Sequence, residues 1–196
     1  EARGATLPEG RLRDGGLLVI EVENLTVRFA GITPIDDMSV TFPGGACGLI
    51  GPNGAGKTTF FNVLSGFVKP STGTIKAFGE DLLKMMDFRR ARWGLRRTFQ
   101  TEQAIEKLSV FDNVAMIHEH SGDGRGSRRS AVMTAIEFVG LDVSPTAKVG
   151  GLGQRERRLV EIARAVVGQP RVVLLDEPAA GLPDQETRHL GEVIRR

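Results

Sequence analysis

Residues 49–61 read LIGPNGAGKTTFF, in which three glycines, one lysine and two threonines follow an apolar run. Glycine adopts positive φ angles without steric cost, so several backbone N–H groups can turn toward one anion. A helix that begins just after the glycines adds the partial positive charge of its N-terminus at the same point. The lysine contributes a full positive charge. This combination indicates a site for a phosphate group.

The spacing fits the G-x-x-x-x-G-K-[ST] pattern of the P-loop through Gly51, Gly56, Lys57 and Thr58. In that pattern Lys57 reaches the β- and γ-phosphates of a nucleoside triphosphate, and the Thr58 hydroxyl holds Mg²⁺. The alternative is a glycine-rich turn without a ligand, which the flanking elements disfavour. The predicted nucleotide-binding residues of this loop are Gly51, Pro52, Asn53, Gly54, Ala55, Gly56, Lys57, Thr58 and Thr59.

A second candidate segment, RVVLLDE at 171–177, ends an apolar strand pattern with two adjacent carboxylates. Asp176, at the carboxyl end of that strand, can hold Mg²⁺ through water. Glu177 can orient or deprotonate the water that attacks the γ-phosphate, so we predict it as the catalytic residue. The alternative is a D-E-P turn that only caps the strand. The sequence contains no N-K-x-D guanine-reading motif.

The elements that position these residues follow from the hydropathy pattern. Alternating or continuous apolar runs predict strands at 17–29, 34–42, 46–51, 74–78 and 171–176. Amphipathic periods predict helices at 57–65, 87–94, 109–120, 127–141, 155–167 and 184–196. The run at 46–51 is continuously apolar, which predicts a strand buried on both faces just before the glycine loop. The loop SGDGRG at 121–126 is expected to be flexible.

Composition excludes several classes of protein. The chain has 196 residues, 40% of them hydrophobic and 26% charged, with a net charge of +2, which is typical of a globular protein with one main core. No apolar run reaches the length of about 18 residues that a membrane helix needs, so a cytosolic location is expected. The arginine clusters at 89–97, 125–129 and 155–158 contain one aromatic residue, Trp93, and tyrosine is absent, which favours solvated helix faces or contacts to another protein over nucleic-acid binding. The single cysteine, Cys47, is expected in the core.

With these motifs in place, the sequence resembles an ATP-binding-cassette (ABC) ATPase from about Leu18 to Arg196. Phe29 matches the aromatic position that stacks on adenine in this family, and Ile35, nearby in sequence, is also expected to contact the ATP. Gln100, in RRTFQ, matches the Q-loop glutamine, which contacts Mg²⁺. The order RTFQ, LSVFDNV and LLDEPAAGL resembles in particular the ATPase subunits of branched-chain amino acid importers.

This resemblance implies an α/β fold of the P-loop NTPase class. It has a mostly parallel, RecA-like core sheet with an antiparallel β subdomain and a helical subdomain insertion, and the C-terminal part is expected to be truncated. The expected division is a flexible tail or linker at 1–16 and an ABC ATPase domain at 17–196. Within that domain, 17–84 form the β subdomain and P-loop core, 85–152 the Q-loop and helical subdomain, and 153–196 the signature helix, Walker B, D-loop and an incomplete core.

The resemblance also implies ATP and Mg²⁺ as ligands and a mechanism that needs partners. Two ABC subunits close head to tail around two ATP molecules, and closure is passed to an integral membrane permease through the Gln100 region. The expected location is therefore the cytoplasm, on the inner face of the cell membrane, and no nucleic acid is expected. Two alternatives stay open: a soluble ABC ATPase of DNA repair or translation, and a nucleotide-binding module with little hydrolysis.

The sequence departs from the family pattern in three places. The signature, usually L-S-G-G-Q, aligns either with Gly150–Gln154 or with Leu152–Glu156; Leu152, Gly153 and Gln154 are common to both, and the serine is missing. Pro183 stands where the D-loop usually has Asp or Asn, or else it starts the last helix. The switch histidine is absent, which suggests a piece cut from a longer protein rather than a naturally short chain. His118 and His120 are expected to be solvated, with no ligand role.

Overall fold

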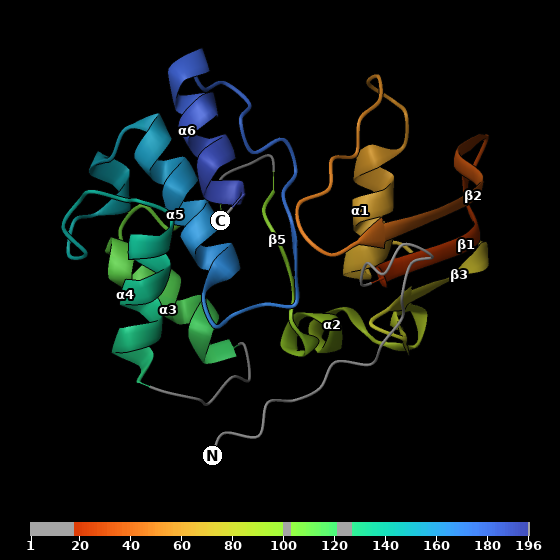
Figure 1. The fold of residues 1–196 in the computed structure, drawn as a ribbon, viewed down its shortest axis with the longest axis horizontal. Coiled ribbons are helices and arrows are strands. Elements are labelled where there is room, and N and C mark those ends of the chain that lie inside the picture. The colour runs from red at the N-terminus through yellow and green to blue at the C-terminus, as the bar shows by residue number, and fades with distance from the viewer. Residues whose placement is uncertain (1–17, 100–102, 121–126, 196) are drawn as a thin grey trace. The chain divides into compact units, whose positions relative to one another are not determined.

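The computed structural model describes residues 18–99, 103–120 and 127–195. The chain forms two units, of which the first ends at Asp87 and the second begins at Phe88. Each unit has its own sheet and its own helices (Figure 1). The predicted tail at 1–16 and the predicted loop at 121–126 lie outside the described residues, so each unit is built from the elements that follow.

The first unit contains a four-stranded antiparallel sheet in the order β2-β1-β3-β4. Its strands are β1 (Leu18–Phe29), β2 (Ile32–Pro43), β3 (Thr72–Ala77) and β4 (Glu80–Asp81). Central Val22 pairs with Val40 on one side and with Ile75 on the other. The alternating patterns at 17–29, 34–42 and 74–78 are thus confirmed as strands, whereas the short β4 was not predicted.

Helix α1 (Lys57–Ser65) lies against β2 in the first unit. The helix begins and ends at the predicted residues, and it ends because Gly66 adopts a left-handed φ of 87°. Its apolar side buries Phe60, Val63 and Leu64, and the Phe60 ring stacks on Phe42 with 5.8 Å between ring centres. This packing fixes the N-terminus of α1 relative to the sheet.

The predicted strand at 46–51 is wrong. Residues 46–50 form no strand, and Ile50 is 95% exposed. An apolar run becomes a central strand only when neighbouring strands pair with both of its edges, and no described strand of the first unit pairs with these residues. Cys47 is consequently exposed and not in the core as expected.

The second unit is mostly helical. Its main helices are α2 (Asp87–Trp93), which begins at the unit boundary, α3 (Val110–His120), α4 (Arg128–Phe138), α5 (Gln154–Val166) and α6 (Asp184–Ile194). A buried apolar cluster joins α3, α4, α5 and α6 through residues such as Val114, Ile136, Val160 and Leu190. Short 3-10 turns occur at Leu82–Lys84 in the first unit and at Val149–Gly151 in the second. The predicted helices of this part of the chain are confirmed to within a few residues.

The second unit also holds a short parallel sheet. Strand β5 (Leu95–Arg97) pairs with β6 (Val172–Leu174), and Arg97 lies opposite Leu174. Strand β6 confirms the apolar core of the prediction at 171–176. Strand β5 was missed, because three residues within a helix-rich segment carry too few positions to show a strand period. These two strands position the acidic segment that follows β6.

Several side chains that were expected in solvent are buried. His118 is 9% exposed, and Arg90 and Arg158 are 4% and 6% exposed. Their long apolar stems and planar head groups let arginines pack inside a helical unit when a partner or a carbonyl is near. The side chain of His120 lies outside the described residues. The expectation of solvated helix faces is therefore wrong for these three residues.

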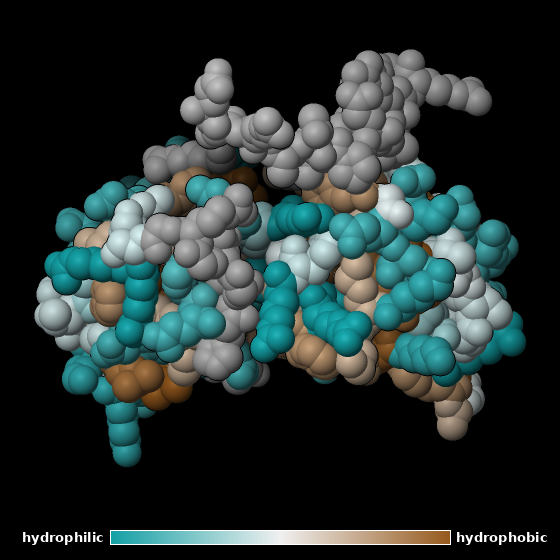
Figure 2. All heavy atoms as spheres, turned by 90° about the horizontal axis from the view of Figure 1, so that it is seen from below, coloured by the Kyte–Doolittle hydropathy of each residue, from teal (hydrophilic) through white to brown (hydrophobic). Residues whose placement is uncertain are grey.

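The exposed surface is mixed in polarity. Figure 2 shows polar side chains interspersed with smaller apolar areas on one face of the molecule. The large apolar side chains that are exposed include Phe29, Ile32, Phe67, Met86 and Phe88. Within the described residues, no helix has the length and apolar character that crossing a membrane requires.

Replacing Gly73 by alanine should destabilise the first unit far more than replacing Gly79. Both glycines have a left-handed φ, so each alanine carries strain of about 1–2 kcal/mol. A Cβ at Gly73 would also lie 2.6 Å from the Cα of Leu25, whereas a Cβ at Gly79 meets nothing within 4 Å. This overlap adds about 1–3 kcal/mol. Urea unfolding followed by far-UV circular dichroism measures both variants, and equal losses would contradict the packing explanation.

Candidate nucleotide-binding and catalytic residues

The glycine loop is shaped by a close approach to strand β2. Gly54 and Gly56 have φ angles of 83° and 82°, in the left-handed region that favours glycine. A Cβ at Gly56 would lie 2.4 Å from the carbonyl oxygen of Pro34 and 3.3 Å from the side chain of Ile35. Only glycine fits at this position. The loop is thus held against the strand by backbone contact.

The N-terminus of α1 is open to an anion. Gly56 is its N-cap, no side chain caps the helix, and the first turn contains no acidic residue. The backbone N–H groups of Lys57, Thr58 and Thr59 have no acceptor among the described residues. A helix end of this kind attracts phosphate through its N–H groups and its dipole. The residues present therefore fit a nucleotide phosphate chain.

Lys57 places its positive charge over the same loop. Its Nζ donates hydrogen bonds to the carbonyl oxygens of Gly51 and Pro52, at 2.7 and 2.8 Å. The ammonium group thereby folds back toward the turn that precedes the helix. Its third proton can be donated to a phosphate oxygen. Thr58, at the second helical position, is exposed and free to present its hydroxyl.

The two residues expected near adenine have different environments. Phe29 ends β1, is 46% exposed and lies opposite Ile32, which is 63% exposed. An exposed aromatic ring offers a face on which a base can stack. Ile35 is 5% exposed and lies against Gly56. Ile35 thus supports the glycine loop from behind, and Phe29 is the residue available to a base.

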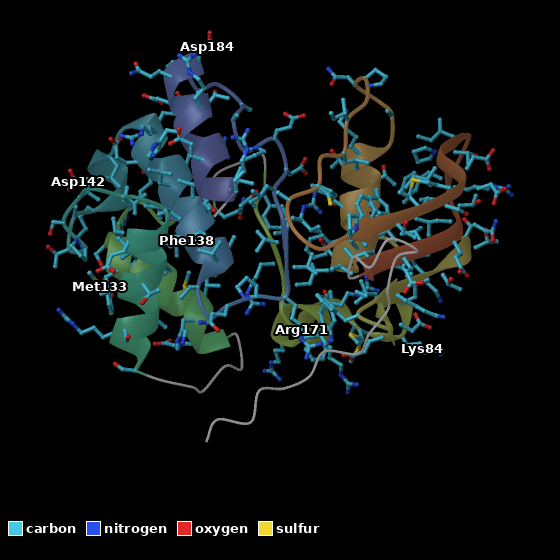
Figure 3. The ribbon with its side chains drawn as sticks, in the orientation of Figure 1. Lys84, Met133, Phe138, Asp142, Arg171 and Asp184 are labelled. Carbon is cyan, nitrogen blue, oxygen red and sulfur yellow. The ribbon has the colours of Figure 1, made fainter. Side chains whose placement is uncertain are left out.

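The acidic segment after β6 is positioned by β5. Arg171, labelled in Figure 3, precedes β6. Its guanidinium lies 4.9 Å from the ring centre of Trp93, and its backbone N–H donates to the carbonyl oxygen of Gly94. At the other end of the strand, the Thr98 N–H donates to Leu174 and the Asp176 N–H donates to the Thr98 hydroxyl. Both ends of β6 are therefore fixed by the neighbouring strand.

The carboxylate of Asp176 forms a buried ion pair. Arg97 Nη2 donates to Asp176 Oδ2 at 2.9 Å, and the two side chains are 5% and 8% exposed. Neither Arg97 nor Thr98 was predicted as a site residue, because only their adjacency to Gln100 in RRTFQ could have suggested it. The neighbouring Arg96 donates to the carbonyl of Ala91, and burial lowers the pKa of the Arg96 guanidinium below its usual value. A guanidinium remains protonated at neutral pH even so.

Glu177 lies on an exposed turn in a strained conformation. Its φ is 47°, which glutamate adopts rarely, and the Ala180 N–H donates to its carbonyl oxygen. Such strain often occurs at functional residues. The side chain is exposed, so water can reach its carboxylate.

Gln100 lies outside the described residues, but Gln103, where the described chain resumes, is held by α5. The Gln103 N–H donates to Glu161 Oε1 at 2.7 Å, and Arg164 pairs with the same oxygen at 2.9 Å. Glu161 is 5% exposed. This contact was not predicted, since a glutamate within a helix pattern gives no sign that its carboxylate is buried.

The residues expected in the signature lie where α5 begins. Gly153 is the N-cap and Gln154 is the first helical residue. A Cβ at Gly153 would lie 2.5 Å from Glu156 Oε2, so the Glu156 carboxylate occupies the space beside the helix N-terminus. The Gln154 amide lies close to Gly181 in the turn after Glu177. Among the described residues from 149 to 156, none has a hydroxyl group in place of the missing serine.

Pro183 is the N-cap of α6, with a φ of −60°. The helix begins at Asp184, so the proline lies one position before the first turn, where the alternative explanation had placed it. Within the described part of the chain, no group of three histidine, cysteine or acidic side chains could hold a metal ion. A metal at Asp176 would therefore need ligands from the nucleotide and water as well as from the protein.

A glycine loop that leads into an uncapped helix with a lysine at its first position defines the class of P-loop nucleoside triphosphatases. The chain matches the ABC transporter family over residues 35–180, and it belongs to that family. The expected P-loop NTPase fold and the resemblance to ABC ATPases are thereby confirmed, and the enzyme class is that of the ABC-type ATPases.

Similar proteins support this assignment. The chain is 35% identical over 192 residues to "High-affinity branched-chain amino acid transport ATP-binding protein LivG" of Escherichia coli, covering 90% of this chain and 75% of that protein. It is 34% identical to the branched-chain amino acid transport ATP-binding protein BraF of Pseudomonas aeruginosa. That match covers 91% of this chain and 76% of BraF. Among solved structures, the ADP conformation of MJ1267, an ATP-binding cassette of an ABC transporter, matches with a TM-score of 0.80 and 26% identity, covering 91% and 76%.

Gly56→Ala should weaken nucleotide binding much more than Gly54→Ala. The two positions have nearly the same φ, but only a Cβ at Gly56 collides with the Pro34 carbonyl, at 2.4 Å. The collision displaces the loop from β2, and we expect Kd to rise by about tenfold or more, which corresponds to about 1.4 kcal/mol. Titration with a fluorescent ATP analogue measures the effect. Equal weakening in the two variants would show that contact with β2 does not shape the loop.

Proposed function

We propose that this chain binds Mg²⁺-ATP and hydrolyses it to drive an importer. The single observation that supports binding best is the open N-terminus of α1, with two left-handed glycines before it and the Lys57 ammonium over the loop. Lys57 and the N–H groups of the first turn would hold the β- and γ-phosphates. The loop residues from Gly51 to Thr59 form the rest of the proposed binding site, and Phe29 would stack on adenine.

For hydrolysis, Glu177 is the proposed general base. It would take a proton from a water molecule whose oxygen attacks the γ-phosphorus, while the bond from that phosphorus to the bridging oxygen breaks and ADP leaves. The exposed, strained turn gives water access to its carboxylate. Thr58, Gln100 and Asp176 would hold Mg²⁺. When bound, the ion neutralises negative charge on the phosphates.

The proposed transporter also contains a second ATPase subunit and a membrane permease. We infer that Leu152, Gly153 and Gln154 would meet the nucleotide of a partner ATPase subunit. The Glu156 carboxylate beside Gly153 makes this helix end less attractive to phosphate, since like charges repel. The chain would lie in the cytoplasm against the inner face of the membrane. We also propose that the cassette consists of three parts, with boundaries at 84/85 and 152/153.

Branched-chain amino acids are the proposed cargo. This choice rests on LivG and BraF, whose names specify branched-chain amino acid transport. Proteins named for ribose import, in Rubrobacter xylanophilus, and for methionine import, in Burkholderia ambifaria, are also similar, at 32% and 34% identity. An ATPase subunit does not contact the cargo, so uptake of radiolabelled leucine by cells that lack this chain tests the choice directly.

A second candidate is a nucleotide-binding module that hydrolyses slowly. The Glu156 carboxylate and the missing signature serine favour it, because both reduce the phosphate affinity of the helix that a partner's nucleotide would meet. The two candidates agree on binding and differ on turnover.

Lys57→Ala should severely weaken nucleotide binding. The variant removes the positive charge over the glycine loop and its charge-assisted hydrogen bonds, so we expect Kd to rise by about 100-fold. Lys69→Ala, at an exposed position in the same unit, is the matched control and should bind as the unaltered chain does. Isothermal titration with ATP and Mg²⁺ measures both. Unchanged binding in Lys57→Ala would remove the basis of the proposed function.

Glu177→Gln should retain ATP binding and lose turnover. The amide cannot accept the proton of the attacking water, so we expect the rate of phosphate release to fall by about 10²–10⁴. Glu137→Gln, on the exposed surface of α4, is the control. Phosphate release and ATP binding are measured for the unaltered chain and for both variants. If the unaltered chain already has negligible turnover and both variants match it, the chain is a binding module.

A further inference from the structure

The ion pair between Arg97 and Asp176 affects the carboxylate that would hold the metal. Both side chains are buried, at 5% and 8% exposed, and Nη2 lies 2.9 Å from Oδ2. A buried guanidinium is always charged and interacts with a carboxylate far more strongly than an exposed one does. Any cation that approaches Asp176 therefore meets a carboxylate whose charge is already partly neutralised.

The two carboxylate oxygen atoms of Asp176 have different surroundings. Arg97 occupies Oδ2, and within the described ranges no residue donates a hydrogen bond to Oδ1. The backbone of Asp176 is held separately through Thr98, and the Arg97 guanidinium is covered by the Phe99 ring at 5.1 Å from its centre. The side chain of Arg97 is thus fixed on two sides. It cannot turn away from Asp176 without breaking both contacts.

We infer that Arg97 is a positioning residue that reserves Oδ2 for itself and weakens the hold of Asp176 on Mg²⁺. This inference rests on the metal role given to Asp176 in the proposed function. Two cations that share one carboxylate repel each other, so the guanidinium raises the dissociation constant of the metal. It also restricts the metal, or its bound water, to Oδ1. The consequence is an ion that departs readily with ADP after hydrolysis.

Arg97→Gln tests the inference, with Arg97→Lys as the matched control. Glutamine keeps an N–H donor, on a shorter side chain, without the charge, whereas lysine keeps the charge. Each variant of the full chain is saturated with a non-hydrolysable ATP analogue and titrated with Mn²⁺, and free Mn²⁺ is followed by electron paramagnetic resonance. We expect the Mn²⁺ Kd to fall by about threefold or more in Arg97→Gln and to change by less than about twofold in Arg97→Lys.

A merely structural role predicts a different result. If Arg97 only stabilised the fold, its loss would weaken metal binding or leave it unchanged, and either outcome would overturn the inference. Tighter binding in Arg97→Lys as well would also overturn it, because the charge would then not be the cause. Circular dichroism checks that each variant folds. Should Arg97→Gln fail to fold, Arg97→Met, with its long apolar stem, replaces it in the same titration.

Asp176→Asn separates this inference from the proposed function. That variant should raise the Mn²⁺ Kd by about tenfold, since an amide is a weaker ligand than a carboxylate. If it does so while Arg97→Gln fails to tighten the metal, the inference about Arg97 is wrong and the metal role of Asp176 stands. If Asp176→Asn leaves the Mn²⁺ Kd unchanged, the metal role itself fails and the inference fails with it.

Discussion

The close approach of the glycine loop to strand β2 is the constraint on which the candidate site depends. The carbonyl oxygen of Pro34 stands where a Cβ at Gly56 would be, so the chain can enter α1 at this point only through a residue without a side chain. That residue must also adopt a left-handed φ, and Gly56 does. Because Phe60 stacks on Phe42, the helix cannot rotate to relieve the contact. The direction in which the helix N-terminus points is thereby fixed by the sheet.

In the second unit, a parallel pair of strands positions Asp176. Strands β5 and β6 are only three residues each, too short to be stable alone. Additional contacts at their ends hold them together, from the Trp93 and Arg171 pair at one end to Thr98 and Asp176 at the other. Asp176 therefore inherits its position from residues nearly 80 positions earlier in the chain. Thr98 and Arg97, which hydrogen-bond to Asp176, precede it by 78 and 79 residues.

Local patterns in the sequence were sufficient where the structure is set by local interactions. Helix α1 was predicted residue by residue, because Lys57 follows the glycines and Gly66 ends the helix. The strand at 46–51 failed because a central strand depends on neighbours that no local pattern describes. The burial of Arg97, His118 and Glu161 was not predicted for the same reason, since each depends on contacts from distant segments. The ligand roles of the site residues remain predictions.

Helices α1 and α5 both follow a glycine N-cap, yet their N-termini differ in charge. The first turn of α1 has no acidic residue and carries a lysine, which leaves its N–H groups and dipole available to an external anion. The first turn of α5 contains Glu156, whose carboxylate lies beside Gly153. A carboxylate near a helix N-terminus stabilises the helix by about 0.3–1 kcal/mol and uses the same positive potential that a phosphate would need. The chain thus leaves one helix end open to an external anion and supplies its own anion at the other, so the two ends cannot be treated as equivalent binding sites.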